Sequence, residues 1–96
     1  MNLKNLVQVC HGIAVEKGFW DSPRNDGELL MLIVSELSEA LEALRAKDIP
    51  HFEEEIADTF IRLADLCGGR DIDIEEEIRK KMRKNIKRPY RHRKAF

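Results

Sequence analysis

Hydrophobic residues recur along the chain at spacings of three and four positions, which is the period of an amphipathic α-helix. The pattern predicts four helices, at about residues 3–17, 28–47, 50–67 and 73–89. No segment shows the alternation that is typical of a half-buried β-strand. We therefore expect an all-α fold, an antiparallel four-helix bundle followed by a basic C-terminal tail.

Residues with strong conformational preferences mark the expected helix boundaries. Asn25 or Asp26 can cap the second helix, because short polar side chains accept hydrogen bonds from free backbone N–H groups. Pro50 suits the first turn of the third helix. The pair Gly68–Gly69 is expected to end that helix.

The second helix carries two apolar surfaces. The expected core stripe consists of Leu30, Ile33, Val34, Leu37, Leu41 and Leu44. The second strip consists of Leu29, Leu32, Ala40 and Ala43. Because this strip exceeds what one small bundle can bury, we expect a homodimer or a homotetramer.

Two pairs of acids interrupt these apolar patterns. Glu36 and Glu39 are three residues apart on the second helix, and Glu55 and Asp58 repeat that spacing on the third. Residues three apart share a helix face, and Glu36 lies within the second apolar strip. If the two helices are antiparallel neighbours, the four carboxylates converge and require a cation such as Mg²⁺.

A solvated helix surface is the alternative interpretation of these acids, because 36% of the residues are charged. A single Glu-x-x-Glu pair would be explained by such a solvated surface. Two pairs on consecutive helices, one with a Glu among apolar residues, favour the metal site, since an unpaired buried carboxylate is costly.

Composition narrows the class of protein further. A chain of 96 residues is expected to form one domain, residues 1–96, with a marginal core of its own. Cys10 and Cys67 lie in apolar helical patterns and are interpreted as buried free thiols of a reduced compartment. No apolar run approaches the roughly 20 residues needed to cross a bilayer. We expect a cytoplasmic protein without a membrane partner.

The net charge of −1 conceals an asymmetric distribution. Ten Lys and Arg residues fall between positions 79 and 94, where there is no acid. Most carboxylates lie between positions 28 and 77. An acidic middle and a basic end would suit a ligand that combines a cation with a polyanion.

The acidic motif and the C-terminal segment of the sequence resemble those of a known family. Glu36-x-x-Glu39 with Glu55-x-x-Asp58 resembles the acidic signature of MazG-like nucleoside triphosphate pyrophosphohydrolases, a superfamily that also includes all-α dCTP pyrophosphatases and dimeric dUTPases. The segment Lys81-Met82-x-x-Asn85-x-x-Arg88-Pro89-Tyr90-Arg91-His92 is similar to the closing segment of short MazG-like proteins. Where that pattern has Gly after the His, this chain has Arg93.

The resemblance implies an enzyme that hydrolyses a nucleoside or deoxynucleoside triphosphate to a monophosphate and pyrophosphate. It implies that Glu36, Glu39, Glu55 and Asp58 are catalytic and bind Mg²⁺, with Mn²⁺ as an alternative ion. It implies that Lys81 and Asn85 bind the triphosphate of the substrate and that His11 and Trp20 line the pocket for its base. Arg88, in the basic end of the chain, could add positive charge to the substrate-binding site.

A binding module without catalytic activity is the rival interpretation. The basic C-terminal end could contact nucleic-acid phosphates or a protein partner. The near-zero net charge, the few aromatic residues of the tail and the absence of a helix-turn-helix pattern argue against nucleic acid.

Overall fold

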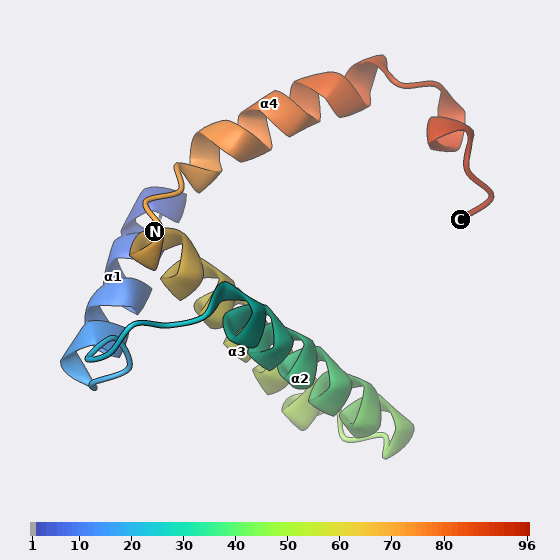
Figure 1. Ribbon diagram of the computed structural model, residues 1–96. Helices are drawn as coiled ribbons and strands as arrows, with labels where there is room; N and C mark the ends of the chain where they lie inside the picture. The colour runs from blue at the N-terminus through green and yellow to red at the C-terminus, as the bar shows by residue number, and fades with distance from the viewer. Residues whose placement is uncertain (1) are drawn as a thin grey trace.

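Figure 1 shows a computed structural model that describes residues 2–96. The helices are α1 (Leu3–Glu16), α2 (Asp26–Arg45), α3 (Ile49–Gly69) and α4 (Ile74–Lys87), followed by the 3₁₀ turn η1 (Tyr90–Arg93). The described residues contain no strand. The prediction of an all-α fold with four helices is therefore confirmed.

The start of every α-helix is set by a polar side chain. The caps Asn2, Asn25, Asp48 and Asp73 each accept a hydrogen bond from the backbone N–H three residues later, at 2.8, 3.1, 3.2 and 3.2 Å. These bonds satisfy donors that have no partner within the first helical turn. Of the two caps expected for α2, the structure selects Asn25.

The α3 helix continues through the glycine pair that was expected to end it. The chain turns instead at Asp71, whose φ of 54° lies in the left-handed region. The N–H of Ile72 donates to the carbonyl of Cys67 at 3.0 Å, which closes a Schellman-type turn. Asp71 thus occupies the position that glycine usually takes.

The glycine pair allows two close contacts across the fold. A Cβ on Gly68 would lie 2.5 Å from Cβ of His11, and a Cβ on Gly69 would overlap the ring of Trp20. Both glycines are therefore needed where α1 and the following loop approach α3. Their role is packing, which the sequence pattern alone did not indicate.

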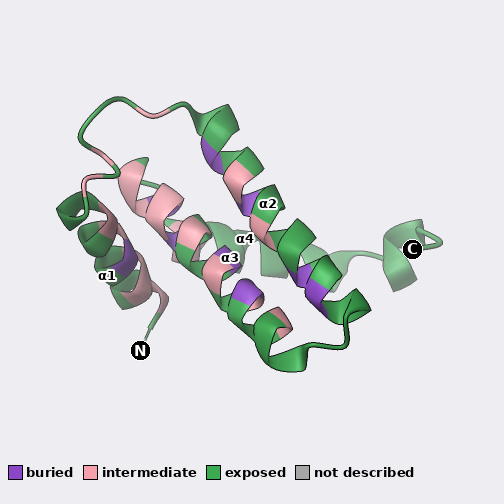
Figure 2. Cartoon of the chain, turned by 90° about the horizontal axis from the view of Figure 1, so that it is seen from below, coloured by how far each residue is buried: buried purple, intermediate pink, exposed green. Residues whose placement is uncertain are grey.

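The α2 and α1 helices pack on two sides of α3, and buried positions lie along these contacts (Figure 2). The buried apolar residues are few and mostly small: Cys10, Leu29, Ile33, Ala40, Ala43, Ala64 and Cys67. Small side chains let the helix backbones approach closely. No large side chain of the described residues is fully buried.

The predicted core stripe of α2 was wrong for a single chain except at Ile33, which is buried. The strip that contains Glu36 faces α3, whereas Leu30, Val34, Leu37, Leu41 and Leu44 remain 44–51% exposed. On α3, the apolar residues Phe60 and Leu63 are also exposed. The physical reason is that the alanines and acids of α2 and α3 fill the contact between these helices.

The α4 helix projects away from the other three helices (Figure 1). Its contacts are with α1, and it has no buried residue. The chain exits in this direction because the turn at Asp71 leads directly into the cap at Asp73. Within residues 2–96, no helix is long and apolar enough to cross a membrane.

The glycine contact provides a test of the packing. Gly69→Ala should lower the free energy of unfolding by about 1–3 kcal/mol, because the added methyl group overlaps the Trp20 ring. Denaturant titration would measure the loss. In the control variant Gly12→Ala, the added Cβ meets no atom within 4 Å, so stability should stay unchanged or rise by up to about 1 kcal/mol. Equal effects at the two positions would contradict the packing argument.

Candidate functional site

Three carboxylates converge between α2 and α3. Glu36 and Glu39 come from α2 and Glu55 comes from α3, and one oxygen of each lies within 4.8 Å of the others. Glu36 and Glu39 share a helix face because they are three residues apart. Three of the four predicted acids thus meet at one point.

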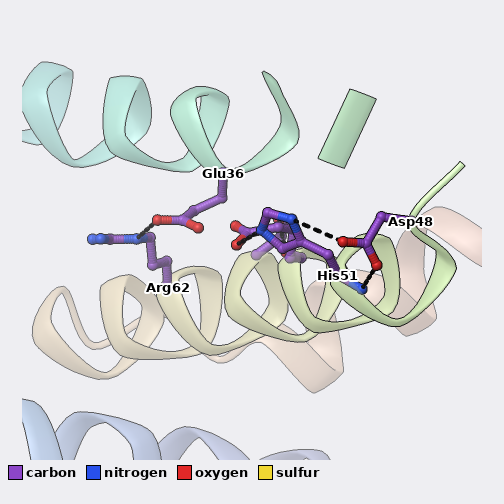
Figure 3. Close-up of polar contacts among 6 residues, drawn as sticks. Glu36, Asp48, His51 and Arg62 are labelled. Atoms are coloured by element: carbon purple, nitrogen blue, oxygen red, sulfur yellow. Dashed lines mark hydrogen bonds and ion pairs between the residues drawn. The ribbon is translucent and has the colours of Figure 1, made fainter. Parts of the chain in front are cut away.

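Arg62 of α3 holds one of these carboxylates in place (Figure 3). Its Nε donates to Oε1 of Glu36 at 3.0 Å, and the Glu36 side chain is only 13% exposed. A charge-assisted hydrogen bond fixes both the position and the ionised state of the carboxylate. Arg62 was not among the predicted site residues.

His51 contacts the group from the other end. Its Nε2 lies 3.2 Å from Oε1 of Glu55, and its Nδ1 lies 4.0 Å from Asp48 (Figure 3). His51 was not among the predicted site residues. The signal was present, because residues four apart on a helix are neighbours and His51 precedes Glu55 by four positions.

Glu55 is the most buried member, with a side-chain exposure of 8%. Its Oε2 is buried and has no hydrogen-bond partner among the described residues. The neighbouring Glu36 carboxylate, followed by burial and by Glu39, raises the pKa of Glu55 to about 7. The pKa of Glu36 is lowered, first by the same contact with Glu55 and then by Arg62. Glu55 therefore retains its proton at pH values where isolated carboxyls are ionised.

Asp58, the fourth predicted acid, lies outside this group. It is half-buried and lines a groove of about 300 Å³ together with Glu36, Arg62 and Asp65. The remaining lining residues come from α1, the loop after it and α3: Cys10, Ile13, Ala14, Lys17, Phe19, Arg24 and Ile61. The groove thus begins at the carboxylate group and extends towards α1.

The comparisons with known proteins decide the family. A model of the MazG nucleotide pyrophosphohydrolase domain matches residues 24–92. The chain belongs to the MazG family. Searches of curated proteins and of solved structures found no match. The matched range contains all four predicted acids, whereas α1 and most of the following loop precede it.

The three converging carboxylates, Glu36, Glu39 and Glu55, suit a hard divalent cation. All three donors are carboxylate oxygens, the ligand type that Mg²⁺ and Mn²⁺ prefer. Arg62 compensates the charge of Glu36 alone, and the Oε2 atom of Glu55 is left without a hydrogen-bond partner among the described residues. A cation bound there would remove both the repulsion and the unsatisfied oxygen.

His11 and Trp20 lie together beside the groove. Nδ1 of His11 and Nε1 of Trp20 are both 2.9 Å from Oδ1 of Asp65, and the two rings meet edge to face at 5.1 Å. The guanidinium groups of Arg24 and Arg70 lie over the Trp20 ring at 5.5 and 5.4 Å. Asp65 was missed, although it follows Asp58 by two helical turns on the same face of α3.

The predicted substrate residues of α4 are not brought to the acids in the single chain. Lys81, Asn85 and Arg88 are exposed, and none of them lines the groove. Arg93, which replaces the Gly that the family resemblance suggests, has a φ of 62°. A non-glycine residue pays roughly 1–2 kcal/mol for this left-handed conformation.

The protonation of Glu55 makes the stability of the metal-free protein depend on pH. The folded protein holds this proton up to about pH 7, whereas the unfolded chain releases it near the ordinary pKa of 4.5. Stability should therefore decrease as pH rises across this window. Glu55→Gln is neutral at every pH, so in EDTA its urea midpoint should exceed that of the wild type at pH 8 and match it at pH 5.

Glu53→Gln is the matched control, because it makes the same chemical change at an exposed position of α3. It should shift the midpoint equally at both pH values. A Glu55→Gln effect that does not change with pH would contradict the raised pKa of Glu55.

Proposed function

We propose that this MazG-family protein is a Mg²⁺-dependent hydrolase of nucleoside or deoxynucleoside triphosphates that releases a monophosphate and pyrophosphate. The observation that carries the proposal is the convergence of Glu36, Glu39 and Glu55 around a buried oxygen with no hydrogen-bond partner. Family membership supplies the reaction class. The role of the enzyme would be to remove unwanted nucleoside triphosphates or to control the concentrations of nucleotides in the cell.

In this proposal, Glu36, Glu39, Glu55 and Asp58 act as the catalytic acids that hold the metal, with Asp58 on the groove side. A bound Mg²⁺, or Mn²⁺ in its place, would neutralise phosphate charge and favour ionisation of the attacking water. Arg62 would keep the Glu36 carboxylate ionised and oriented. These residues therefore prepare a site that is negatively charged until a cation binds.

The groove beside the acids is the proposed position of the nucleotide. Lys17 and Arg24 line it and can contact phosphate oxygens. His11 and Trp20 would define the wall on the base side, since Asp65 fixes both rings next to the groove. The contribution of Lys81, Asn85 and Arg88 then depends on how α4 is placed in the assembled protein.

We also propose a homodimer or homotetramer that assembles through the exposed stripe of α2. Leu30, Val34, Leu37, Leu41 and Leu44 form a continuous apolar surface along that helix. An exposed surface of this kind marks an interaction site. Each subunit would consist of one domain, residues 1–96. The free thiols of Cys10 and Cys67 are consistent with a protein of the reduced cytoplasm.

A module that binds nucleic acid or a partner through its basic end is the second candidate function. The exposed bases of α4 and η1 favour it. Salt-sensitive DNA binding without any hydrolysis would support this candidate instead of the enzyme.

Hydrolysis is tested with a panel of canonical and modified triphosphates in the presence of Mg²⁺, with pyrophosphate release as the measurement. Glu36→Gln should lower kcat by at least about 100-fold, because it removes one negative charge from the metal site. Glu42→Gln makes the same change at an exposed α2 position paired with Arg45, and should retain activity. The absence of turnover for every triphosphate, together with the absence of Mg²⁺ binding, would refute the enzyme.

Assembly is tested separately by sedimentation. Leu37→Glu places a charge in the middle of the exposed stripe and should convert the oligomer to monomers with unchanged helical content. Ser35→Glu adds the same charge at an exposed polar position of α2 and should leave the mass unaltered. A monomeric wild type at micromolar concentration would show that the stripe does not join subunits.

A further inference from the structure

His51 lies against the acidic group on the side away from the groove proposed for the nucleotide. It lines a separate, smaller groove of about 250 Å³ together with Glu39 and Asp48. The groove that begins at Glu36 and Arg62 has no lining residue in common with it. His51 is also not one of the residues whose donor oxygens converge within 4.8 Å. The ring therefore touches the acidic group without facing either the nucleotide position or the point where the three acids meet.

Asp48 fixes both the backbone and the ring of His51 (Figure 3). Its Oδ1 accepts from the backbone N–H of His51 at 3.2 Å as the cap of α3, and its Oδ2 lies 4.0 Å from Nδ1 of the ring. The other ring nitrogen, Nε2, lies 3.2 Å from Oε1 of Glu55. Because His51 and Glu55 are four residues apart on one helix, the first turns of α3 are sufficient to set this contact.

The two oxygens of Glu55 have different surroundings. Oε1 lies beside Nε2 of His51, whereas Oε2 is buried and has no hydrogen-bond partner among the described residues. A carboxylate that binds a cation is ionised and can only accept, so the Nε2–H group of His51 would donate to Oε1. Arg62 treats Glu36 in the same way, since it donates to Oε1 of that residue. Each contact occupies one oxygen of a carboxylate and leaves the other for a cation.

Divalent cations differ in how they use a carboxylate. Mg²⁺ demands a near-ideal octahedral arrangement with short bonds, whereas Ca²⁺ takes more oxygens and often binds both oxygens of one carboxylate. A glutamate with one oxygen already occupied can supply a single ligand. Such a residue suits Mg²⁺ and denies Ca²⁺ its second oxygen.

We propose that His51 is a positioning residue that reserves one oxygen of Glu55 for the cation and thereby makes the acidic group select Mg²⁺ over Ca²⁺. This role rests on the proposed function, because it takes the three acids as ligands of the metal. Residues that hold metal ligands through hydrogen bonds affect metal affinity without touching the metal. His51 acts on the cation in this way, through Glu55.

Cation binding in the absence of nucleotide tests this role. The thermal unfolding midpoint of the full chain is measured at increasing MgCl₂ or CaCl₂, because a cation that binds the folded protein raises the midpoint. His51→Ala should weaken Mg²⁺ binding by about 10–100-fold, as expected when a ligand loses its supporting hydrogen bond. Ca²⁺ binding should stay within about threefold of the wild type or become tighter, since both oxygens of Glu55 are then open.

Two further variants separate the hydrogen bond from other effects. His51→Gln keeps an N–H donor near the position of Nε2, so its Mg²⁺ affinity should stay within about threefold of the wild type. His92→Ala removes a His from an exposed position of η1 and should leave the affinities for both ions unchanged. The His51 side chain is 48% exposed and Ala is favourable in a helix, so His51→Ala should fold normally.

Unchanged Mg²⁺ binding in His51→Ala would overturn the proposal. An equal loss of both ions would also overturn it, because a general disturbance of the acids does not distinguish between cations. So would a His51→Gln variant that loses as much Mg²⁺ binding as His51→Ala, since the donor would then not be the property that matters.

Pyrophosphate release, measured separately, distinguishes this proposal from the proposed function. A selective loss of Mg²⁺ binding in a protein that hydrolyses no triphosphate would refute the enzyme and support the role of His51. Hydrolysis by His51→Ala with the Mg²⁺ dependence of the wild type would refute the role of His51 and leave the enzyme in place. A wild-type midpoint that responds to neither ion would overturn both proposals.

Discussion

The structure depends on the burial of carboxylates between two helices. The side chains of Glu36 and Glu55 are only 13 and 8% exposed, and isolated charges at such positions would be costly. The raised pKa of Glu55 keeps this carboxyl neutral below about pH 7, and the bond from Arg62 compensates the charge of Glu36. The α2–α3 contact is therefore held in a state that a divalent cation would stabilise.

This constraint explains why the remaining core is small. Alanines and acids fill the contact between α2 and α3, so the larger leucines of α2 are turned outwards. A chain of 96 residues that leaves these side chains exposed gains stability by association. The site and the assembly are thus linked, because the orientation of α2 that brings Glu36 to α3 also exposes the leucine stripe.

The groove lies on the side of α3 that contacts α1. Gly68 and Gly69 allow α1 and the Trp20 loop to lie close to the helix, and Asp65 bonds both His11 and Trp20. Arg24 and Arg70 cover the Trp20 ring. Packing contacts therefore set the shape of a groove whose chemistry comes from the neighbouring acids.

Much of this protein follows from the sequence by itself. The period of the pattern determines the helices, and the caps determine where they begin, because both depend on residues within one helical turn. The spacing of Glu36 and Glu39 was sufficient to predict that they share a helix face, and the expectation that Glu55 meets them required α2 and α3 to be antiparallel neighbours. Local signals could not show which strip of α2 faces α3, since both strips are apolar. Only the tertiary structure placed His51, Arg62 and Asp65 at the site, left Asp58 outside the carboxylate group and directed α4 away from it. These features depend on how helices pack against one another, and a helical pattern carries no information on its partner.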